Sequence, residues 1–460
     1  MQSSHAASRL SASFSDPNLI ASAGLVPLVH LAERCGLPTL IHRHVDLGAT
    51  TGANPAGKAM SLVAGMCVGA DSIEDMDVLR TGATSRLFSG IYAPSTLGSF
   101  LRSFTHGHVR QLQAAARRFT ANLITHAGLI PPGEPIVYLD VDSKVKQVYG
   151  TAKQGASFGY TKVRGLHFQI VTASTPSSRP VVMATRLRKG SAGSGKGADS
   201  LVAEAIRALR EAGVTAMILV RADSAFFSAK LVKAIRAAGA HYSITVANTN
   251  TIRTAIAAIP ETAWKPIKYR NAVWDQDERR WISEAEIAEI PYTAFTSKKT
   301  DLHARGRLIV RRVRRLNPAT MPEGQGELFA TYRHHAFHTT NPLVIDQAEP
   351  MHRQHAVIEQ VFADLENGPL GHLPSGKFQA NAAWLALAAI AHNLTRAAAT
   401  LASRFHAKAT GATVRATLIN IPARLASGTR RLHLHLPENW PRASGFLTLW
   451  ARTGHRPITS

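Results

Sequence analysis

The chain has 460 residues, a hydrophobic content of 45% and a formal net charge of +23. This hydrophobic content is enough to form a core, so global disorder is excluded, and the length predicts two to four structural units. A strong basic excess on a folded chain points to a polyanionic partner, most often nucleic acid, with a basic but otherwise conventional enzyme as the alternative. Two cysteines are too few for a disulfide framework or a four-thiolate zinc site.

The cysteines, Cys35 and Cys67, indicate reduced core thiols of a cytosolic protein. Neither a signal peptide nor a membrane-spanning helix is expected, because the N-terminus lacks a charged region followed by an apolar one and the most apolar helix, at 384–394, is too short. The net charge is −1 over residues 1–100, +16 over 101–350 and +8 over 351–460. The surface that faces a polyanion is therefore expected mostly beyond residue 100.

Helical periodicity dominates the first part of the chain. It predicts helices at 25–35, 55–68, 72–80 and 96–127, and Pro131-Pro132-Gly133 ends the helical pattern. The stretch 96–127 carries four arginines, which suit either a helix lying along a phosphate backbone or an ordinary solvated helix face. These arginines are Arg102, Arg110, Arg117 and Arg118.

After the break the pattern becomes β-rich. Runs at 136–142, 166–173 and 180–187 predict three antiparallel strands. A helix at 198–212, a short apolar strand at 217–220, a helix at 227–238 and a strand at 241–247 follow. The order β-β-β-α-β-α-β is that of a ribonuclease-H-like domain that still lacks its final helix.

Periodicity is poor from about 248 to 341, a segment that contains three of the six tryptophans and a dense run of arginines. We expect strands at 307–316 and 328–335 there, and helices at 351–366 and 379–401. The predicted fold class is α/β: a ribonuclease-H-like mixed sheet interrupted by a β-rich insertion, with an N-terminal helical region and a C-terminal helical tail. The predicted boundaries are 1–130 for the helical region, 131–248 for the first part of the core, 249–341 for the basic insertion, 342–402 for the last helices of the core, and 403–460 for the tail.

Acidic residues occur on three of the predicted elements. Asp140 and Asp142 are two residues apart on the first strand, so both project from one face of the sheet. Asp223 lies at the carboxyl end of the short apolar strand, where open α/β sheets place functional groups. Glu359 is the best candidate for a third acid, on the helix at 351–366. Taken singly, each acid is as compatible with a helix cap, a turn or a surface ion pair; together they predict a site for Mg²⁺-dependent phosphoryl transfer.

Three sequence blocks carry a resemblance to a known family. They are Tyr138-Leu139-Asp140-Val141-Asp142-Ser143, Leu219-Val220-Arg221-Ala222-Asp223-Ser224-Ala225-Phe226 and Ile358-Glu359-Gln360-Val361-Phe362-Ala363-Asp364-Leu365-Glu366-Asn367-Gly368-Pro369. With them, the chain resembles a bacterial insertion-sequence DDE transposase of the group named after insertion sequence thirteen-eighty, which is related to the Y-R-E-K transposases.

The resemblance implies that Asp142, Asp223 and Glu359 are catalytic and, together with Asp140, hold two Mg²⁺ ions, for which Mn²⁺ substitutes. It implies cleavage of double-stranded DNA at terminal inverted repeats and strand transfer into target DNA, by a homodimer in the synaptic complex. It further implies a DNA-binding role for the N-terminal region and a cytoplasmic, nucleoid-associated protein of a bacterium. Neither a membrane nor a nucleotide cofactor is expected.

The chain departs from the family signature around Glu359. His352 and His355 stand where a tyrosine and an arginine are expected, Arg353 is a substitute for that arginine from the adjacent position, and Glu366 replaces a phosphate-binding lysine. A catalytically inactive, transposase-derived DNA-binding protein is therefore the alternative function. The residues expected to contact DNA are Arg186, Arg188, Lys196, Arg305, Arg307, Arg311, Arg312, Arg314, Arg315, His352, Arg353 and His355, with Trp274 and Trp281 as candidates for stacking on a flipped base.

Two other patterns suggest different chemistry. The segment from Gly190 to Gly197 nearly matches a phosphate-binding P-loop, but Gly197 occupies the position where a hydroxyl should bind Mg²⁺. We interpret it instead as a flexible basic loop near DNA. The spacing of His352, His355 and Glu359 on one helical face also suits a zinc hydrolase, although chance clustering is expected among 21 histidines.

Overall fold

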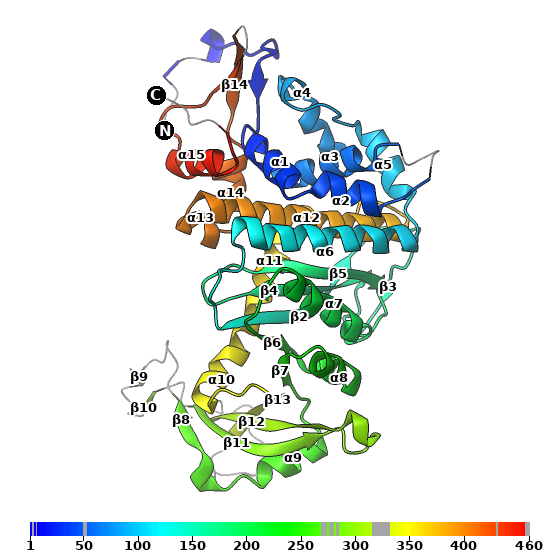
Figure 1. Cartoon of the computed structure of the whole chain (residues 1–460), viewed down its shortest axis with the longest axis vertical. Helices are drawn as coiled ribbons and strands as arrows, with labels where there is room; N and C mark the ends of the chain where they lie inside the picture. The colour runs from blue at the N-terminus through cyan, green and yellow to red at the C-terminus, as the bar shows by residue number, and fades with distance from the viewer. Residues whose placement is uncertain are drawn as a thin grey trace.

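The structure, a computed structural model of the chain, describes residues 1, 4–5, 7–48, 53–267, 274–275, 280–281, 285–314, 332–428 and 431–455. A layer of N-terminal helices stands on one side of two long helices, α6 (His106–Ala127) and α12 (Phe378–Ala402), and a large mixed sheet lies on the other side (Figure 1). The fold is thus of the mixed α/β class that the sequence predicted.

Helix boundaries in the N-terminal region follow local signals. Asn54 caps the helix that starts at Pro55, because its side chain accepts a hydrogen bond from the backbone N of Gly57 at 2.9 Å. Gly69 ends this helix with a φ of 118°, which favours glycine. The elements of the region are η1 (Ala7–Arg9), β1 (Leu19–Ile20), α1 (Leu25–Arg34), α2 (Leu37–His44), α3 (Pro55–Val68), η2 (Glu74–Arg80), α4 (Thr84–Leu87), α5 (Pro94–Arg102) and α6.

The single helix predicted at 96–127 is wrong in one respect, because the structure divides it into α5 and α6. Thr105 adopts an extended conformation between them, with φ −97° and ψ 176°. Its hydroxyl accepts a hydrogen bond from the backbone N of His108 at 3.4 Å, and the His108 ring accepts one from the backbone N of Thr105 at 3.2 Å. This reciprocal cap starts a new helix within a continuous amphipathic pattern.

The central sheet has ten strands. They lie in the order β4, β2, β6, β7, β13, β12, β11 and β8, and both β5 and the short β3 pair with the outer edge of β4. Their bounds are β2 (Ile136–Gln147), β3 (Ser157–Phe158), β4 (Arg164–Ser174), β5 (Val181–Lys189), β6 (Met217–Ala222), β7 (His241–Thr245), β8 (Lys265–Ile267), β11 (Ala285–Ala294), β12 (Ala304–Arg314) and β13 (Tyr332–Thr339).

Strand directions agree with the sequence predictions. The pairs β2–β4 and β4–β5 are antiparallel, which confirms the three antiparallel strands, whereas β2–β6 and β6–β7 are parallel. Helices connect the parallel strands, as the geometry of parallel pairing requires. The helical elements that accompany these strands are α7 (Ala198–Glu211), η3 (Ser224–Phe226), α8 (Ala229–Ala237), α9 (Asn250–Ala257), η4 (Glu261–Ala263) and η5 (Thr300–Leu302).

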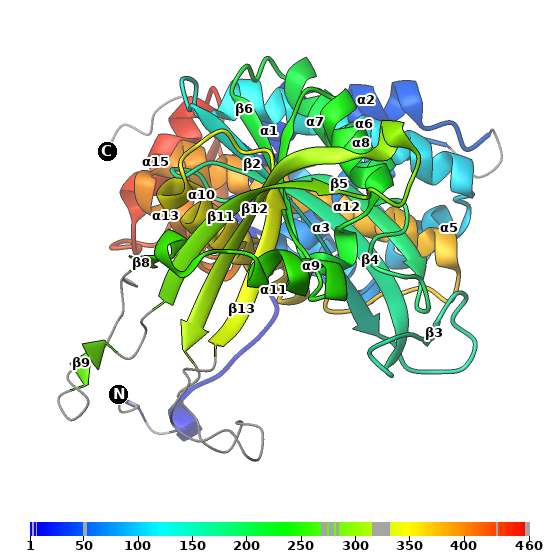
Figure 2. The same cartoon turned by 90° about the horizontal axis from the view of Figure 1, so that it is seen from below.

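The two faces of β2 have different surroundings. Val137, Leu139 and Val141 point into the main hydrophobic core, whereas Ile136 and Tyr138 belong to a small cluster on the other face. Figure 2 shows α7 and α8 on one side of the sheet and α11 on the other. Because side chains alternate along a strand, the acids of β2 share the face of Ile136 and Tyr138.

The strands from 249 to 341 continue the sheet that carries the acids. Phe337 of β13 is the partner of Thr245 of β7, and β12, β11 and β8 follow in turn. The strands predicted at 307–316 and 328–335 correspond to β12 and β13, although residues 315–331 lie outside the described part of the chain. The strand β11 and the helix α9 were not predicted. A separate two-stranded hairpin is formed by β9 (Trp274–Asp275) and β10 (Arg280–Trp281).

The last part of the chain returns to helices, as predicted. The helix expected at 351–366 is interrupted: Pro350 lies inside its first segment, and a 3₁₀ turn follows. The tail also contains two strands, which pair with β1 near the start of the chain. The elements are α10 (Ile345–Arg353), η7 (Gln354–Val357), α11 (Ile358–Glu366), α12, α13 (Arg404–Lys408), α14 (Gly411–Val414), η8 (Arg415–Ile419), β14 (Ala423–Ser427), β15 (Leu432–His435) and α15 (Ala443–Arg452).

Two expectations about the whole chain can be compared with this fold. Both cysteines are buried and unpaired, and burial raises the pKa of Cys35 to about 11 and that of Cys67 to about 12. Within the part of the chain that the structure describes, none of the helices combines the length and the apolar character that crossing a bilayer requires.

Candidate active site

The three acids predicted to converge line one cavity of about 400 Å³. Asp142 lies on β2, Asp223 directly follows the last residue of β6, and Glu359 is in the first turn of α11. Because β2 and β6 run parallel, with Asp140 as the partner of Arg221, the two aspartates lie toward the same end of the sheet. The start of α11 places Glu359 against that end.

The carboxyl group of Asp142 has a perturbed pKa in this cavity. The pKa is raised from 3.8 to about 6, chiefly by burial and to a lesser degree by the negative charges of Asp223 and Glu359. A hydrogen bond of 2.7 Å from the backbone N of Ser143 and the nearby His355 oppose this rise. The carboxylate of Asp142 is therefore held in a site that disfavours its own charge.

The donor chemistry of the cavity suits a divalent cation, although the acids do not form a closed cage. In the described residues, no three histidine, cysteine, aspartate or glutamate side chains stand close enough together to hold a metal ion as they are. Carboxylate oxygens are the ligands that Mg²⁺ prefers, and a cation would favour the charged form of Asp142, whose pKa is raised chiefly by burial. The three carboxylates thus fit the expected cofactor by charge and ligand type.

Asp140, the fourth acid predicted to hold metal, lies outside the cavity lining. Its carboxylate is buried and forms a two-pronged ion pair with Arg221, with both N–O distances at 2.7 Å. The side chains of Asp140 and Arg221 are 0% and 1% exposed. The metal role predicted for Asp140 is therefore corrected, because both of its oxygens are already taken by the guanidinium of Arg221.

The Asp140–Arg221 pair connects the two strands that carry aspartates with the helical elements that precede α11. Arg221 donates a hydrogen bond of 2.6 Å to the carbonyl oxygen of Met351, in α10, and its guanidinium lies 4.0 Å from the ring centre of Tyr138. His355, in η7, donates to Asp140 at 3.0 Å. Asp140 and Arg221 each precede a cavity aspartate by two residues, and His355 precedes Glu359 by four. One buried ion pair thus fixes β2, β6 and the helical segment relative to one another.

Basic side chains form another part of the same cavity. Arg311 of β12 and Arg353 of α10 both line it, and the DNA contact expected of these two arginines stays a prediction. Glu349, which is buried, lies between them: its Oε1 is 2.7 Å from Nε of Arg353 and 3.7 Å from Nε of Arg311. The cavity therefore has carboxylates on one side and two arginines, organised by a buried glutamate, on another.

His352 also lines the cavity, but its ring is engaged in internal contacts. It hydrogen-bonds the hydroxyls of Ser243 at 2.9 Å and Thr245 at 3.1 Å, and it stacks on Phe337 with the ring centres 4.0 Å apart. Burial lowers the pKa of His352 to about 3, so the ring is neutral at pH 7. The contact to phosphate that was predicted for His352 does not fit this environment, which instead joins α10 to β7 and β13.

Glu366, which replaces the lysine of the family signature, has an ion-pair partner on the neighbouring strand. Lys144 of β2 lies 2.8 Å from the carboxylate of Glu366 and 5.5 Å from the ring centre of Phe362. Lys144 follows Asp142 by two residues, so both project from the same face of β2. The pairing brings a lysine beside the acidic elements from the strand rather than from α11.

The prediction that the segment 190–197 is a flexible basic loop is wrong, because internal hydrogen bonds hold this segment in place. Arg188 is buried and donates to the carbonyl oxygens of Gly193, Ser194 and Lys196. A P-loop directs backbone N–H groups toward phosphate, whereas this loop directs carbonyl groups onto an arginine. A nucleotide site does not fit this arrangement. The DNA contact predicted for Arg188 does not fit it either, whereas Lys196 is exposed.

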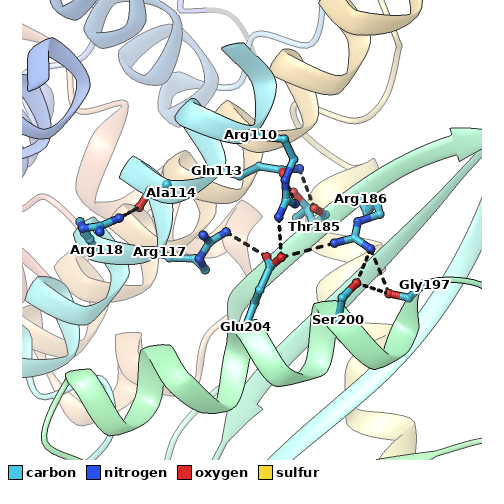
Figure 3. Close-up of polar contacts among 10 residues, drawn as sticks. All are labelled: Arg110, Gln113, Ala114, Arg117, Arg118, Thr185, Arg186, Gly197, Ser200 and Glu204. Carbon is cyan, nitrogen blue, oxygen red and sulfur yellow. Dashed lines mark hydrogen bonds and ion pairs between the residues drawn. The ribbon is translucent and has the colours of Figure 1, made fainter. Parts of the chain in front are cut away.

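Arg186 is part of a different cluster, shown in Figure 3. It donates to the carbonyl oxygen of Gly197 at 3.0 Å and to the hydroxyl of Ser200 at 2.9 Å, and it lies 3.6 Å from the carboxylate of Glu204. Arg110 and Arg117 of α6 contact the same glutamate (Figure 3). These contacts hold α6, β5 and α7 together.

Other predicted DNA contacts are spread over the insertion. Arg312 is buried against Trp264 and Tyr332 and is paired with Glu261 and Glu286, so it is not available to DNA. Arg307 is paired with Glu289, and Arg305 is exposed. Arg315 lies outside the described residues, as do the side chains of Arg314, Trp274 and Trp281.

Some residues of the cavity were not found from the sequence. The lining of the cavity also contains Glu349, His335 and Thr245. Arg221 does not line it but forms the buried ion pair with Asp140. Arg221 had a detectable signal, since its position before Asp223 matches that of Asp140 before Asp142. The others lie on elements whose pairing only the fold reveals.

An α/β protein with convergent acids on two parallel strands and a following helix, beside two arginines, has the arrangement expected of an enzyme that handles phosphodiesters. A family model described as "Transposase DDE domain group 1" matches residues 2–456, nearly the whole chain. The chain belongs to this family and is a transposase of the DDE class, and this membership implies DNA as the substrate. No curated protein matches the chain.

Proposed function

We propose that this transposase cuts DNA at the ends of a mobile element and transfers the freed strands to target DNA in a Mg²⁺-dependent reaction. The observation that carries the proposal is the single cavity shared by Asp142, Asp223 and Glu359, from three separate elements, with Arg311 and Arg353 in the same lining. Such a combination of carboxylates and guanidinium groups provides ligands for cations and donors for phosphate.

We further propose that β2, β4, β5, β6 and β7, with α7, α8 and α11, form a ribonuclease-H-like catalytic core. Its support is the strand order β5-β4-β2-β6-β7, with the first three strands antiparallel and the last two parallel to β2. In this proposal the insertion at 249–341 lies between the last strand of the core and the helix that carries Glu359.

Asp142, Asp223 and Glu359 are the residues that would hold two Mg²⁺ ions, or Mn²⁺ in their place. Such ions, when bound, activate the attacking oxygen and stabilise the leaving 3′ oxygen. Arg311 and Arg353, kept in place by Glu349, bind the phosphate groups on either side of the reacting one. Asp140 and Arg221 are positioning residues, because they link the acidic elements without lining the cavity, whereas His355 lines the cavity and also donates a hydrogen bond to Asp140.

The finer biological expectations are part of the same proposal. They are terminal inverted repeats as the recognised DNA, a homodimer in the synaptic complex, DNA binding by the N-terminal helices and a nucleoid-associated location in a bacterium. Membership of the thirteen-eighty group rests on the sequence blocks around Asp142, Asp223 and Glu359. No role is assigned to a nucleotide cofactor, because the loop at 190–197 turns its carbonyl groups onto Arg188.

The test is cleavage of a plasmid that carries the gene with its native flanking DNA. Purified full-length protein should nick or cut the flanks in Mg²⁺ or Mn²⁺, without ATP, and the Asp142→Ala variant should not. Asp301→Ala is the matched control, since Asp301 forms only an exposed pair with Lys233. Tight binding of the flanking DNA by a wild-type protein that never cuts it would overturn the catalytic proposal.

That outcome would establish the alternative, a catalytically inactive DNA-binding protein. The observation that favours the alternative is Glu366 in the place of a phosphate-binding lysine. The ion pair between Glu366 and Lys144 weakens this argument, since it keeps a lysine beside the acidic elements. The Lys144→Ala variant separates the two effects: a loss of cleavage would assign the phosphate-binding role to Lys144.

A further inference from the structure

A second hollow, of about 610 Å³, lies on the other side of the helical segment that carries Glu359. His355, Ile358 and Glu359 line the catalytic cavity, whereas Val357 and Gln360 line this second hollow. Ala356 lines both. One short helical segment therefore forms a wall between the two spaces, and we call the second one the Arg179 hollow.

The lining of the Arg179 hollow is suited to anions. Arg179, Lys408 and Arg221 contribute to it, and none of the described lining residues carries a carboxylate. The turn at 174–178 adds several hydroxyl groups, of which those of Thr175 and Ser177 already donate to Glu134. Hydroxyl, amide and guanidinium groups without an acid are the set that proteins use to contact phosphate oxygens.

Arg179 is held in a defined position without a counter-charge. Its Nε donates to the carbonyl oxygen of Lys408 at 2.9 Å, and its Nη1 donates to the side-chain oxygen of Gln360 at 2.6 Å. Its Nη2 has no hydrogen-bond partner among the described residues. Arg221, by contrast, is already neutralised by Asp140. Arg179 and the exposed Lys408 therefore supply the positive charge of the hollow.

The turn that faces these cations is also internally supported. Glu134 accepts hydrogen bonds from the hydroxyls of Ser177 and Thr175. The backbone N of Thr175 donates to the hydroxyl of Ser178 at 3.1 Å. Glu134 does not line the hollow, so the turn lies between its carboxylate and the hollow.

The geometry points to the backbone of the DNA strand being cut as the occupant. We propose that the Arg179 hollow binds phosphates of that strand, a few nucleotides from the phosphodiester in the catalytic cavity. An α-helix is about 10 Å wide with its side chains, and successive phosphates of a DNA strand advance by about 3.4 Å along the helix axis. A strand that passes over the segment 354–360 thus places its neighbouring phosphates about three nucleotides from the reacting one. This inference rests on the proposed function.

The experiment introduces negative charge into the hollow at exposed positions. Lys408→Glu and Gln354→Glu are suited to this, because both side chains are exposed. Lys299→Glu is the control for Lys408→Glu: it is an exposed lysine of the insertion, outside the hollow, and it changes the net charge by the same amount.

The first readout is the affinity for duplex DNA that carries the mapped cleavage site. We expect Lys408→Glu to weaken binding by about tenfold and to lower the salt dependence by about one phosphate contact, whereas Lys299→Glu changes neither by more than about twofold. Equal affinities for Lys408→Glu and Lys299→Glu would overturn the proposal.

The second readout locates the contact on the DNA. Neutral methylphosphonate linkages placed two to four nucleotides from the cut should weaken binding of the wild type but have no further effect on Lys408→Glu, because the variant has already lost that contact. If only strand transfer from pre-cut ends is impaired, the phosphates belong to target DNA and the assignment to the cut strand is wrong. A wild type that binds this DNA but does not cut it contradicts the proposed function alone.

Discussion

The catalytic cavity and the Glu204 cluster, which consists of Glu204 with Arg110, Arg117 and Arg186, are built in opposite ways. In the cluster a single carboxylate, 14% exposed, lies 2.5 Å, 3.0 Å and 3.6 Å from guanidinium groups of the three arginines (Figure 3). In the cavity three carboxylates belong to one lining. Charges are therefore matched with opposite charges in one region and grouped with like charges in the other.

This difference shows that a count of charged residues does not identify a site. The arginines of the stretch 96–127 suited either a phosphate-binding helix or a solvated helix face, yet two of them link α6 to α7 and β5 through Glu204. The pKa of Asp142 in the cavity is raised chiefly by burial and, to a lesser degree, by the charges of Asp223 and Glu359. A buried carboxylate beside other acids, rather than one matched with basic groups, marks the place where we expect a cation to bind.

The largest expected effect is on the rate of DNA cleavage. Asp223→Asn and Glu359→Gln should each lower cleavage by at least about 1,000-fold, because each removes a negative charge from the cation-binding group while keeping the shape of the side chain. Both variants should remain folded. Rates are measured on the plasmid with native flanks and stability by urea unfolding; a variant that keeps more than a tenth of the wild-type rate would contradict the assignment.

The next effect concerns the buried pair beneath the cavity. Asp140→Ala should destabilise the protein by about 3 kcal/mol, since it leaves Arg221 buried without a counter-charge. The double variant Asp140→Leu/Arg221→Met should regain most of this stability, because it removes both charges. Its cleavage should nevertheless stay at least about tenfold below wild type, since Met351 and His355 lose their anchor. Wild-type cleavage by a stable double variant would show that the pair has no positioning role.

A smaller effect is expected in the Glu204 cluster. Glu204→Gln should lower the free energy of unfolding by about 1–2 kcal/mol, because three arginines lose their shared counter-charge in a partly solvated site. Cleavage per folded molecule should not change. Asp77→Asn, which disrupts only the exposed pair with Arg80, is the matched control and should leave unfolding unaffected. A selective loss of cleavage in Glu204→Gln would break the distinction between the two regions.

The smallest effect is a gain in stability that depends on pH. Folding raises the pKa of Asp142 from 3.8 to about 6, so the ionised carboxylate is disfavoured in the folded state. Its cost is complete above about pH 6 and disappears as the pH falls toward 3.8. Asp142→Asn should therefore stabilise the metal-free protein by about 1–2 kcal/mol at pH 8 and have no effect near pH 3.8. Urea unfolding at the two pH values measures this, and equal effects would contradict it.

Much of the sheet was predictable because its strands have strong local signals. The apolar run at 217–220 becomes the buried strand β6, and the breaker at Pro131-Pro132-Gly133 directly precedes the change from helix to sheet. The strand β11 escaped prediction because Ala285–Ala294 contains several alanines and glutamates and a proline, all weak strand formers. Its strand conformation depends on pairing with β12 and β8.

The candidate site was predictable only where the chemistry is local. Asp142 and Asp223 could be found because each lies on or after an apolar strand. Glu349 could not, since the two arginines that it contacts come from α10 and from the distant strand β12. The same limit applies to Lys144 and Glu366, which lie 222 residues apart.

The pairing of β13 with β7 has a consequence for how this enzyme can be altered. Arg311 lies on β12. A continuous ladder of backbone hydrogen bonds joins β12 through β13 and β7 to β6, the strand that precedes Asp223. Such a ladder leaves no break in the sheet between the strands of the segment 249–341 and the strands that carry the acids. A graft of another insertion onto this scaffold would thus have to reproduce the strand register residue by residue, since a slip by one position turns every side chain to the opposite face.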